Sequence, residues 1–81
     1  MKYLVIEIQK FPDGTVAIGQ PTSHDTREKA DARFYTILAA AALSSQPKHG
    51  AIIVSENCMQ VASKYYDRES NSHEVVDQAE E

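Results

Sequence analysis

The sequence predicts an α+β fold, in which one helix packs on one face of a four-stranded antiparallel sheet. Three observations predict it. Apolar and polar residues alternate near both ends of residues 1–66, one stretch of helical periodicity lies between them, and turn residues separate the segments. The predicted order is therefore strand, strand, helix, strand, strand (ββαββ). A helix on one face of an antiparallel sheet is an economical way to bury such segments.

The first two strands are expected to form a hairpin. Residues 3–9 (YLVIEIQ) alternate as a strand does, and residues 15–19 return with the same period. Residues 11–14 (FPDG) between them are turn formers, because proline presets φ and glycine accepts positive φ. The most apolar face of this hairpin consists of Leu4, Ile6, Ile8, Val16 and Ile18.

A helix is predicted over residues 26–43. Apolar residues recur there at spacings of three and four, namely Ala30, Phe34, Ile37, Leu38 and Ala41. Asp25, three residues before Glu28, resembles a capping box that would satisfy the first free amides. Pro47 disfavours helix in the residue before it, so the helix is expected to end by residues 44–46.

Two further strands are predicted after the helix. Residues 51–55 (AIIVS) are almost continuously apolar, as in a strand covered on both faces, and residues 60–66 follow a turn in which Asn57 suits left-handed φ. The first and third strands are the most apolar and are placed centrally. The predicted sheet order is therefore 2-1-3-4, with all neighbours antiparallel.

Charge divides the chain into one folded domain, residues 1–66, and an acidic tail, residues 67–81. The first part carries seven basic and six acidic residues, a net charge of +1, whereas the tail carries one arginine and six acids, a net charge of −5. Such a tail is expected to be mostly flexible. Val75, Val76 and Ala79 would allow a short helix within it.

One helix can cover only one face of the sheet, so the second face requires another partner. We expect this uncovered interaction face to hold Tyr3, Val5, Ala17, Ile53, Lys64 and Tyr66, although neighbours of Ile53 fit the third strand equally well. An apolar sheet face of this kind predicts protein association, most simply a twofold homodimer. The open edges of the second and fourth strands are the alternative contact.

The composition argues against several classes of protein. A net charge of −4 provides no basic field for nucleic acid, and one cysteine cannot form a disulfide framework. No apolar run approaches the roughly 18 residues of a membrane helix, and residues 1–10 lack the features of a signal peptide. We therefore expect a cytoplasmic protein, or one assembled into a particle such as a virion from the cytoplasm.

No residue pattern predicts catalysis, a metal site, a cofactor or a small-molecule substrate. His24, His49 and His73 lack a second ligand at helical spacing, and only His49, beside Gly50 at the start of a strand, merits inspection. Cys58 has no neighbouring base that would activate its thiol. The helix dipole accounts for the acids at the helix start, which are Asp25, Glu28 and Asp31.

Single-stranded nucleic-acid binding is the alternative function. An open antiparallel sheet that bears Tyr3, Tyr65 or Tyr66 together with Lys64 has the parts of a base-stacking platform. The acidic tail and the nearly neutral domain oppose it, because both lack the positive field that attracts phosphates. A non-enzymatic interaction or structural protein is therefore the leading prediction.

Several stretches resemble a set of small proteins of uncharacterised function that prophages and related mobile elements of gut Firmicutes encode. The likeness rests on residues 6–9 (IEIQ), residues 13–15 (DGT), residues 37–44, Pro47 with His49, and the pair Tyr65 and Tyr66. Together they span residues 1–66, and members of the set carry a glycine near position 58. The resemblance implies a gene product of a phage-like or mobile element and no catalytic residues.

Overall fold

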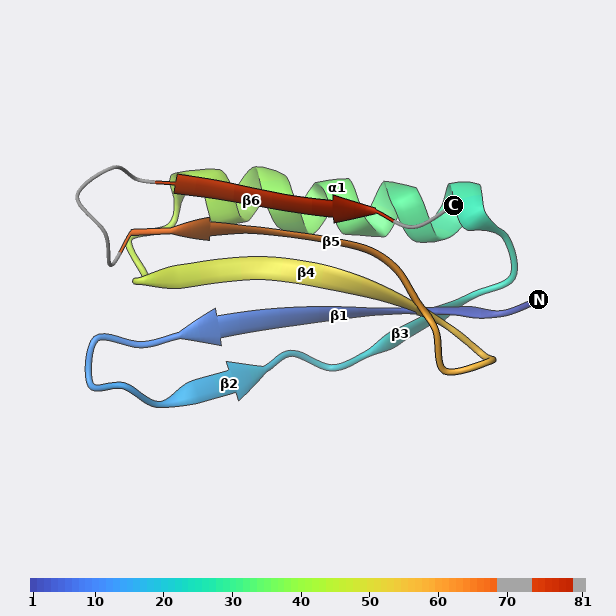
Figure 1. Ribbon diagram of the computed structural model, residues 1–81, viewed down its shortest axis with the longest axis horizontal. Coiled ribbons are helices and arrows are strands. Elements are labelled where there is room, and N and C mark those ends of the chain that lie inside the picture. Colours follow the sequence, from blue (N-terminus) through green and yellow to red (C-terminus); the bar gives the residue numbers. More distant parts are fainter. Residues whose placement is uncertain (69–73, 80–81) are drawn as a thin grey trace.

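The computed structural model describes residues 1–68 in full and the main chain of residues 74–79 (Figure 1). The elements in chain order are β1 (Tyr3–Lys10), β2 (Val16–Ile18), β3 (Thr22–His24), α1 (Arg27–Leu43), β4 (Lys48–Ser55), β5 (Gln60–Asp67) and β6 (Glu74–Ala79). The predicted α+β class is confirmed, because one helix packs on an open sheet whose neighbouring strands are all antiparallel.

The sheet has the strand order β2-β1-β4-β5-β6, and β3 pairs with β1 beside β2. The four expected strands therefore stand in the expected order, and two strands are added. β3 is short and follows Pro21. β6 pairs with β5 from Ala62↔Ala79 to Asp67↔Glu74, so residues 74–79 form a strand, where the sequence predicts a flexible segment or a short helix. Residues 69–73 and 80–81 of the tail lie outside the described residues.

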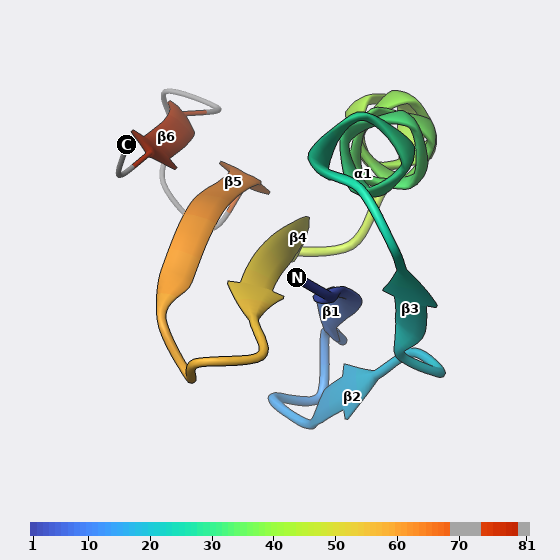
Figure 2. The same ribbon diagram turned by 90° about the vertical axis from the view of Figure 1, so that its right-hand side faces the viewer.

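The sheet curls around the helix. Figure 2 shows β3 on one side of α1 and β5 on the other, so that the helix lies in the concave face of the sheet. Among the described residues, α1 contacts β1, β3, β4 and β5. The strand β6 overlaps α1 in Figure 1 but lies apart from it in Figure 2. The convex face of the sheet therefore points away from the helix.

The first hairpin turn forms as its residues predict. The amide of Gly14 donates to the carbonyl of Phe11 at 2.9 Å, and Gly14 takes a φ of 92° that a residue with a side chain rarely adopts. Asp13 accepts hydrogen bonds from the hydroxyl of Thr15 at 2.7 Å and from its amide at 2.9 Å. The side-chain bond from Thr15, and then the main-chain bond, lower the pKa of Asp13.

The second hairpin turn places the left-handed residue one position later than expected. Cys58, and not Asn57, has positive φ, at 66°. The amide of Cys58 donates to the carbonyl of Ser55 at 3.0 Å, and Ser55 in turn donates to Met59 at 2.9 Å. These bonds determine the turn, so the chain accepts an unfavourable conformation at a residue that has a Cβ.

We predict that Cys58→Gly stabilises the protein. A left-handed residue with a Cβ costs about 1–2 kcal/mol. Glycine removes that cost but adds conformational freedom to the unfolded chain, so the expected net gain is about 0.5–1 kcal/mol. Urea denaturation measures it, with Cys58→Ala as the control because alanine removes the thiol and keeps the strain. Equal stability of the two variants would contradict the explanation.

Thr26, and not Asp25, caps the helix. Its hydroxyl accepts a hydrogen bond from the amide of Lys29 at 3.2 Å, which is the bond that an N-cap residue makes. The carboxylate of Asp25 instead pairs with the ammonium of Lys2 at 3.1 Å. The capping box expected between Asp25 and Glu28 is therefore wrong, because Thr26 is the N-cap residue and Lys2, just before β1, binds the Asp25 carboxylate.

The hydrophobic core lies between α1 and the concave face of the sheet. Its buried members are Val5, Ala30, Phe34, Ile37, Leu38, Ala51, Ile53 and Ala62. All four helical members belong to the predicted stripe. On the sheet, Val5 and Ile53 are cross-strand partners with exposed fractions of 1% and 0%. Alanines on the two layers allow the helix to approach the strands closely.

The core reverses the two faces of the sheet relative to the prediction. Val5 and Ile53 were expected on the uncovered face, yet both lie beneath α1. Side chains that lie opposite one another on paired strands share a face of the sheet. An assignment of one strand to the wrong face therefore places the side chains of its partner strands on the wrong face as well. In the first strand the more apolar face, that of Leu4, Ile6 and Ile8, lies away from the helix, so alternation within this strand favours the wrong face.

Arg68 stabilises the C-terminal end of α1, although the sequence places it in the tail. One guanidinium nitrogen donates to the carbonyls of Ala41 at 2.7 Å and Ala42 at 3.0 Å. The last turn of the helix has no basic residue of its own. The Arg68 guanidinium therefore supplies the hydrogen-bond donor for the free carbonyls and the positive charge that stabilises the helix dipole. The guanidinium also lies 5.4 Å from the centre of the Tyr66 ring.

We predict that Arg68→Ala lowers the free energy of unfolding by about 2 kcal/mol, because hydrogen bonds from a charged donor and a partly buried cation are lost. Urea denaturation measures the loss. Arg68→Lys keeps the charge without the planar donor group, so its free energy of unfolding should lie between those of the wild type and Arg68→Ala. A loss below about 0.5 kcal/mol in the alanine variant would contradict the capping role.

Candidate functional site

The convex face of the sheet is the candidate site, and we call it the open face. Cross-strand register and alternation place on it the residues Leu4, Ile6, Ile8, Val16, Ile18, Ile52, Val54 and Tyr65. Four of them expose large apolar side chains to solvent, from 38% at Ile8 to 66% at Ile18. The other four are half-buried.

Aliphatic residues occupy the open face more densely than the concave face. The concave face includes the polar residues Glu7, Gln9, His49 and Lys64 beside its core residues. The open face is aliphatic along the middle of β1 and β4, and its charged residues Lys10, Lys48 and Asp67 form one row at the end of the strands. This connected apolar surface is the feature that makes the open face the candidate site.

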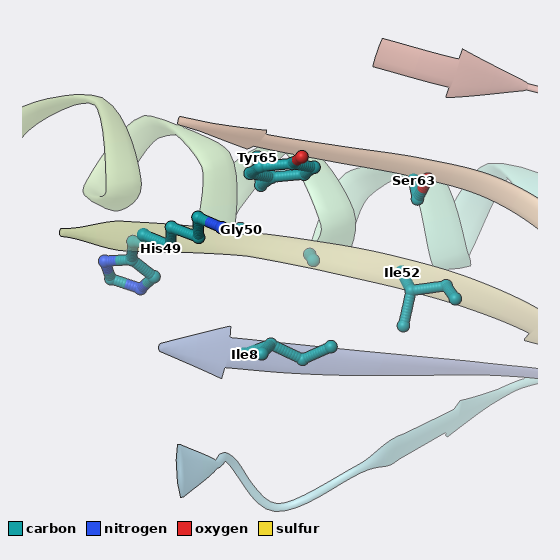
Figure 3. Close-up of a pocket in the computed structure, with 8 residues that line it drawn as sticks. Ile8, His49, Gly50, Ile52, Ser63 and Tyr65 are labelled. Carbon is teal, nitrogen blue, oxygen red and sulfur yellow. The ribbon is translucent and has the colours of Figure 1, made fainter. Parts of the chain in front are cut away.

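A hollow of about 240 Å³ lies on the open face. Figure 3 shows Ile8, Ile52 and Tyr65 around Gly50, where β4 presents main chain instead of a side chain. A Cβ added to Gly50 would overlap the carbonyl oxygen of Lys64 and the Cβ of Tyr65. The close approach of β5 therefore requires glycine here, and the main chain at Gly50 lines the hollow.

The six residues predicted for the interaction face all lie on the other face of the sheet. Register places Tyr3, Val5, Ala17, Ile53, Lys64 and Tyr66 on the concave side. Val5 and Ile53 are in the core, and Ala17 is exposed on β2. The prediction of a second apolar face is supported, whereas the six residues named for it are wrong because the faces were reversed. The alternative left open for the third strand agrees with the structure, because Ile52 and Val54, the neighbours of Ile53, lie on the open face.

The tyrosines do not form a row on the open face. Tyr3 and Tyr66 lie on the concave side, and Tyr65 alone among the described tyrosines of the strands lies on the open face. Lys64 also belongs to the concave side. The stacking platform expected for single-stranded nucleic acid therefore loses most of its proposed residues.

Buried His49 pairs with half-buried Glu7. The Glu7 carboxylate accepts a hydrogen bond from Nε2 of His49 at 2.6 Å, and the two side chains are 24% and 7% exposed, respectively. Nδ1 of His49 is buried without a hydrogen-bond partner. No local pattern in the sequence predicts this pair, because the two residues are 42 positions apart. It depends on the pairing of β1 with β4.

The other histidines give no metal site in the described part of the chain. His24 Nε2 lies 2.8 Å from the hydroxyl of Thr22, and His73 is outside the described residues. Residues 1–68 contain no group of three or more histidine, cysteine, aspartate or glutamate side chains placed to hold a metal ion. Cys58 is exposed at its turn.

The acids at the helix start occupy surface positions. Asp25 pairs with Lys2, and that hydrogen bond and charge lower the pKa of Asp25. Asp31 pairs with Arg27 at 2.8 Å, the expected spacing of four along the helix. Glu28 is exposed. The structure therefore gives these carboxylates helix-start and ion-pair roles.

Comparison with protein-family models, curated proteins and solved structures gives no match to this chain. The resemblance to prophage-encoded proteins therefore stays a prediction. Among the described residues, no helix combines the length and the apolar character that are needed to span a membrane.

Proposed function

We propose that this chain is a non-enzymatic association module in which two copies pair through their open faces. The observation that carries the proposal is the uncovered aliphatic surface opposite the helix, with Val16 and Ile18 each more than 60% exposed. Burying such surface is the main favourable term in protein association. A second copy is the occupant, because a twofold axis covers both surfaces at once and leaves neither apolar face wet.

The area of the open face agrees with a dimer interface. The strands of the sheet hold 36 residues, and at about 3.3 Å per residue and about 4.8 Å between strands they cover roughly 570 Å² per copy. Two copies would then bury roughly 1,100 Å², just above the area of about 1,000 Å² that a specific interface needs. Sheets packed in this way lie about 10 Å apart with their strands within about 30°, as in a β-sandwich.

The edges of the sheet provide a poorer contact than its face. β2 and β3 have three residues each, and Pro21 between them has no amide to donate. At the opposite edge, the sequence of β6 carries Glu74 and Asp77, and charges on edge strands discourage pairing with another sheet. We therefore propose the face and not the edges.

The resemblance to prophage-encoded proteins supplies the proposed setting, a minor structural or assembly protein of a phage-like or mobile element in the cytoplasm. Single-stranded nucleic acid remains the alternative ligand. It has weaker support, because Tyr65 is the single aromatic residue on the open face among the described residues of the strands, and base stacking along a strand needs several.

We predict that the wild-type chain sediments as a dimer, at twice its mass of 9.0 kDa, at concentrations above roughly 10 µM. Ile52→Lys should sediment as a monomer with an unchanged circular dichroism spectrum, because it places a charge at the centre of the apolar interface. The matched control is Ala39→Lys on the exposed side of α1, which should remain dimeric.

Sedimentation equilibrium from 1 to 200 µM measures these three proteins. A wild type that stays monomeric over the whole range would overturn the proposal. So would dissociation by Ala39→Lys with a persistent dimer in Ile52→Lys, because that result assigns the interface to the helix. Binding of a labelled oligonucleotide at low salt by a monomeric wild type would favour the alternative.

A further inference from the structure

A row of cross-strand partners on the open face places a protruding side chain next to a hollow. The register pairs Ile18 with Ile8, Ile8 with Gly50, and Gly50 with Tyr65. Ile8 exposes 38% of its surface, and its neighbour in the row has no side chain. The open face thus carries a knob on β1 and a hole on β4 at the same height along the strands.

The size and lining of the hollow suit an aliphatic side chain. Its volume of about 240 Å³ exceeds the roughly 150 Å³ of a cavity that accepts benzene. It is smaller than the roughly 300–1,000 Å³ of pockets for drug-sized ligands. Ile8, Ile52 and the Tyr65 ring surround Gly50, so a branched hydrocarbon chain would find apolar contacts around it (Figure 3).

A twofold axis makes this row complementary to itself. If the axis runs parallel to the strands and between β1 and β4, it exchanges these two strands across the interface. Ile8 of each copy then faces Gly50 of the other, and Ile18 of each copy faces Tyr65. The charged row of Lys10, Lys48 and Asp67 stays at the end of the strands, in the rim where interfaces accept charge.

We infer that Ile8 is the anchor residue of the proposed dimer and that it enters the hollow over Gly50 of the second copy. The inference rests on the proposed function, and it adds the register and the anchor that a face alone does not give. Side chains that fill a partner's pocket near the centre of an interface contribute most of the binding free energy. The twofold axis gives two such contacts in the dimer, because Ile8 of each copy enters the hollow of the other.

Two measurements test the inference. In dimers mixed from isotope-labelled and unlabelled chains, a filtered nuclear Overhauser experiment should detect contact between the Ile8 methyl groups of one copy and the Gly50 Hα of the other. Mixed labelling is necessary because the two residues are also neighbours within a chain. Ile8→Ala should raise the dissociation constant about 30-fold.

Leu4→Ala is the matched control, because Leu4 lies on the same strand and face with a nearly equal exposed fraction of 39%. Its expected effect is less than about 5-fold, since it lies outside the row. A dimer without the Ile8–Gly50 contact, or equal effects of the two variants, would overturn this inference and leave the proposed dimer standing. A monomeric wild type would overturn both.

Discussion

Gly50→Ala is expected to lower the free energy of unfolding by about 3 kcal/mol or more, which is enough to unfold much of a marginally stable domain of this size. The added methyl group would overlap main-chain and Cβ atoms of β5, at the Lys64 carbonyl and at Tyr65. A flexible side-chain tip could move aside, but here β4 and β5 would have to separate.

Urea denaturation of Gly50→Ala measures this loss, and Gly14→Ala is the control. Gly14 has open space where the methyl group of alanine would lie and a φ of +92°, so alanine there meets backbone strain alone. Such strain costs about 1–2 kcal/mol. If Gly50→Ala lost no more stability than Gly14→Ala, the close approach of β5 to β4 would be wrong, and the hollow that depends on it would be wrong as well.

Much of the fold follows from local patterns in the sequence. The helix, both hairpins and the order of the four main strands result from periodicity, turn residues and the central position of the most apolar strands. The helix and the two hairpins depend on residues close together in the chain, whereas the strand order follows from placing the two most apolar strands side by side. The turn at residues 11–15 is an example, because proline, aspartate and glycine there determine the turn without any distant contact.

The orientation of the sheet could not be obtained in this way. In β1, Val5 and Ile6 are both apolar and point to opposite faces, so the strand alone allows the helix on either side. Close packing decides between them. Ala51 and Ala62 lie beside Val5 and Ile53 on the concave face, and their small side chains let α1 approach the strands closely there.

The tail illustrates a second limit. Its acidic composition indicates solvation, but β6 pairs with β5 through main-chain hydrogen bonds, which do not depend on side-chain charge. Composition likewise places Arg68 in the tail, yet it contacts carbonyls 26 and 27 residues earlier in the chain. The available signal was indirect, namely a helix without a basic residue in its last turn.

The sequence predicts that an uncovered apolar face exists, but it does not predict which residues form that face. One helix and a sheet apolar on both sides require an uncovered apolar face, and the structure has one. The hollow depends on the pairing of Gly50 with Tyr65, and that pairing depends on an irregularity between Ile53 and Val54. A one-residue change in register moves side chains to the opposite face, so the composition of either strand gives no indication of the hollow.

The neighbouring isoleucines of β4 provide the second large effect. Ile53 is fully buried beneath α1, whereas Ile52 lies half-buried on the open face. Ile53→Ala should lower the free energy of unfolding of the monomer by about 3–4 kcal/mol, through lost burial and the cavity that remains. Ile52→Ala removes the same atoms from a surface position, so the monomer should lose about 1 kcal/mol or less.

For dimer affinity the order should be reversed, with Ile52→Ala showing the larger loss. Unfolding curves at several protein concentrations, fitted together, separate monomer stability from the dissociation constant. Ile52→Ala should raise the dissociation constant, and Ile53→Ala should reduce stability at every concentration. The reverse result would return Ile53 to an uncovered face and place the helix over Ile52. Because the two residues are identical in type and adjacent in sequence, only the face that each occupies can account for the difference.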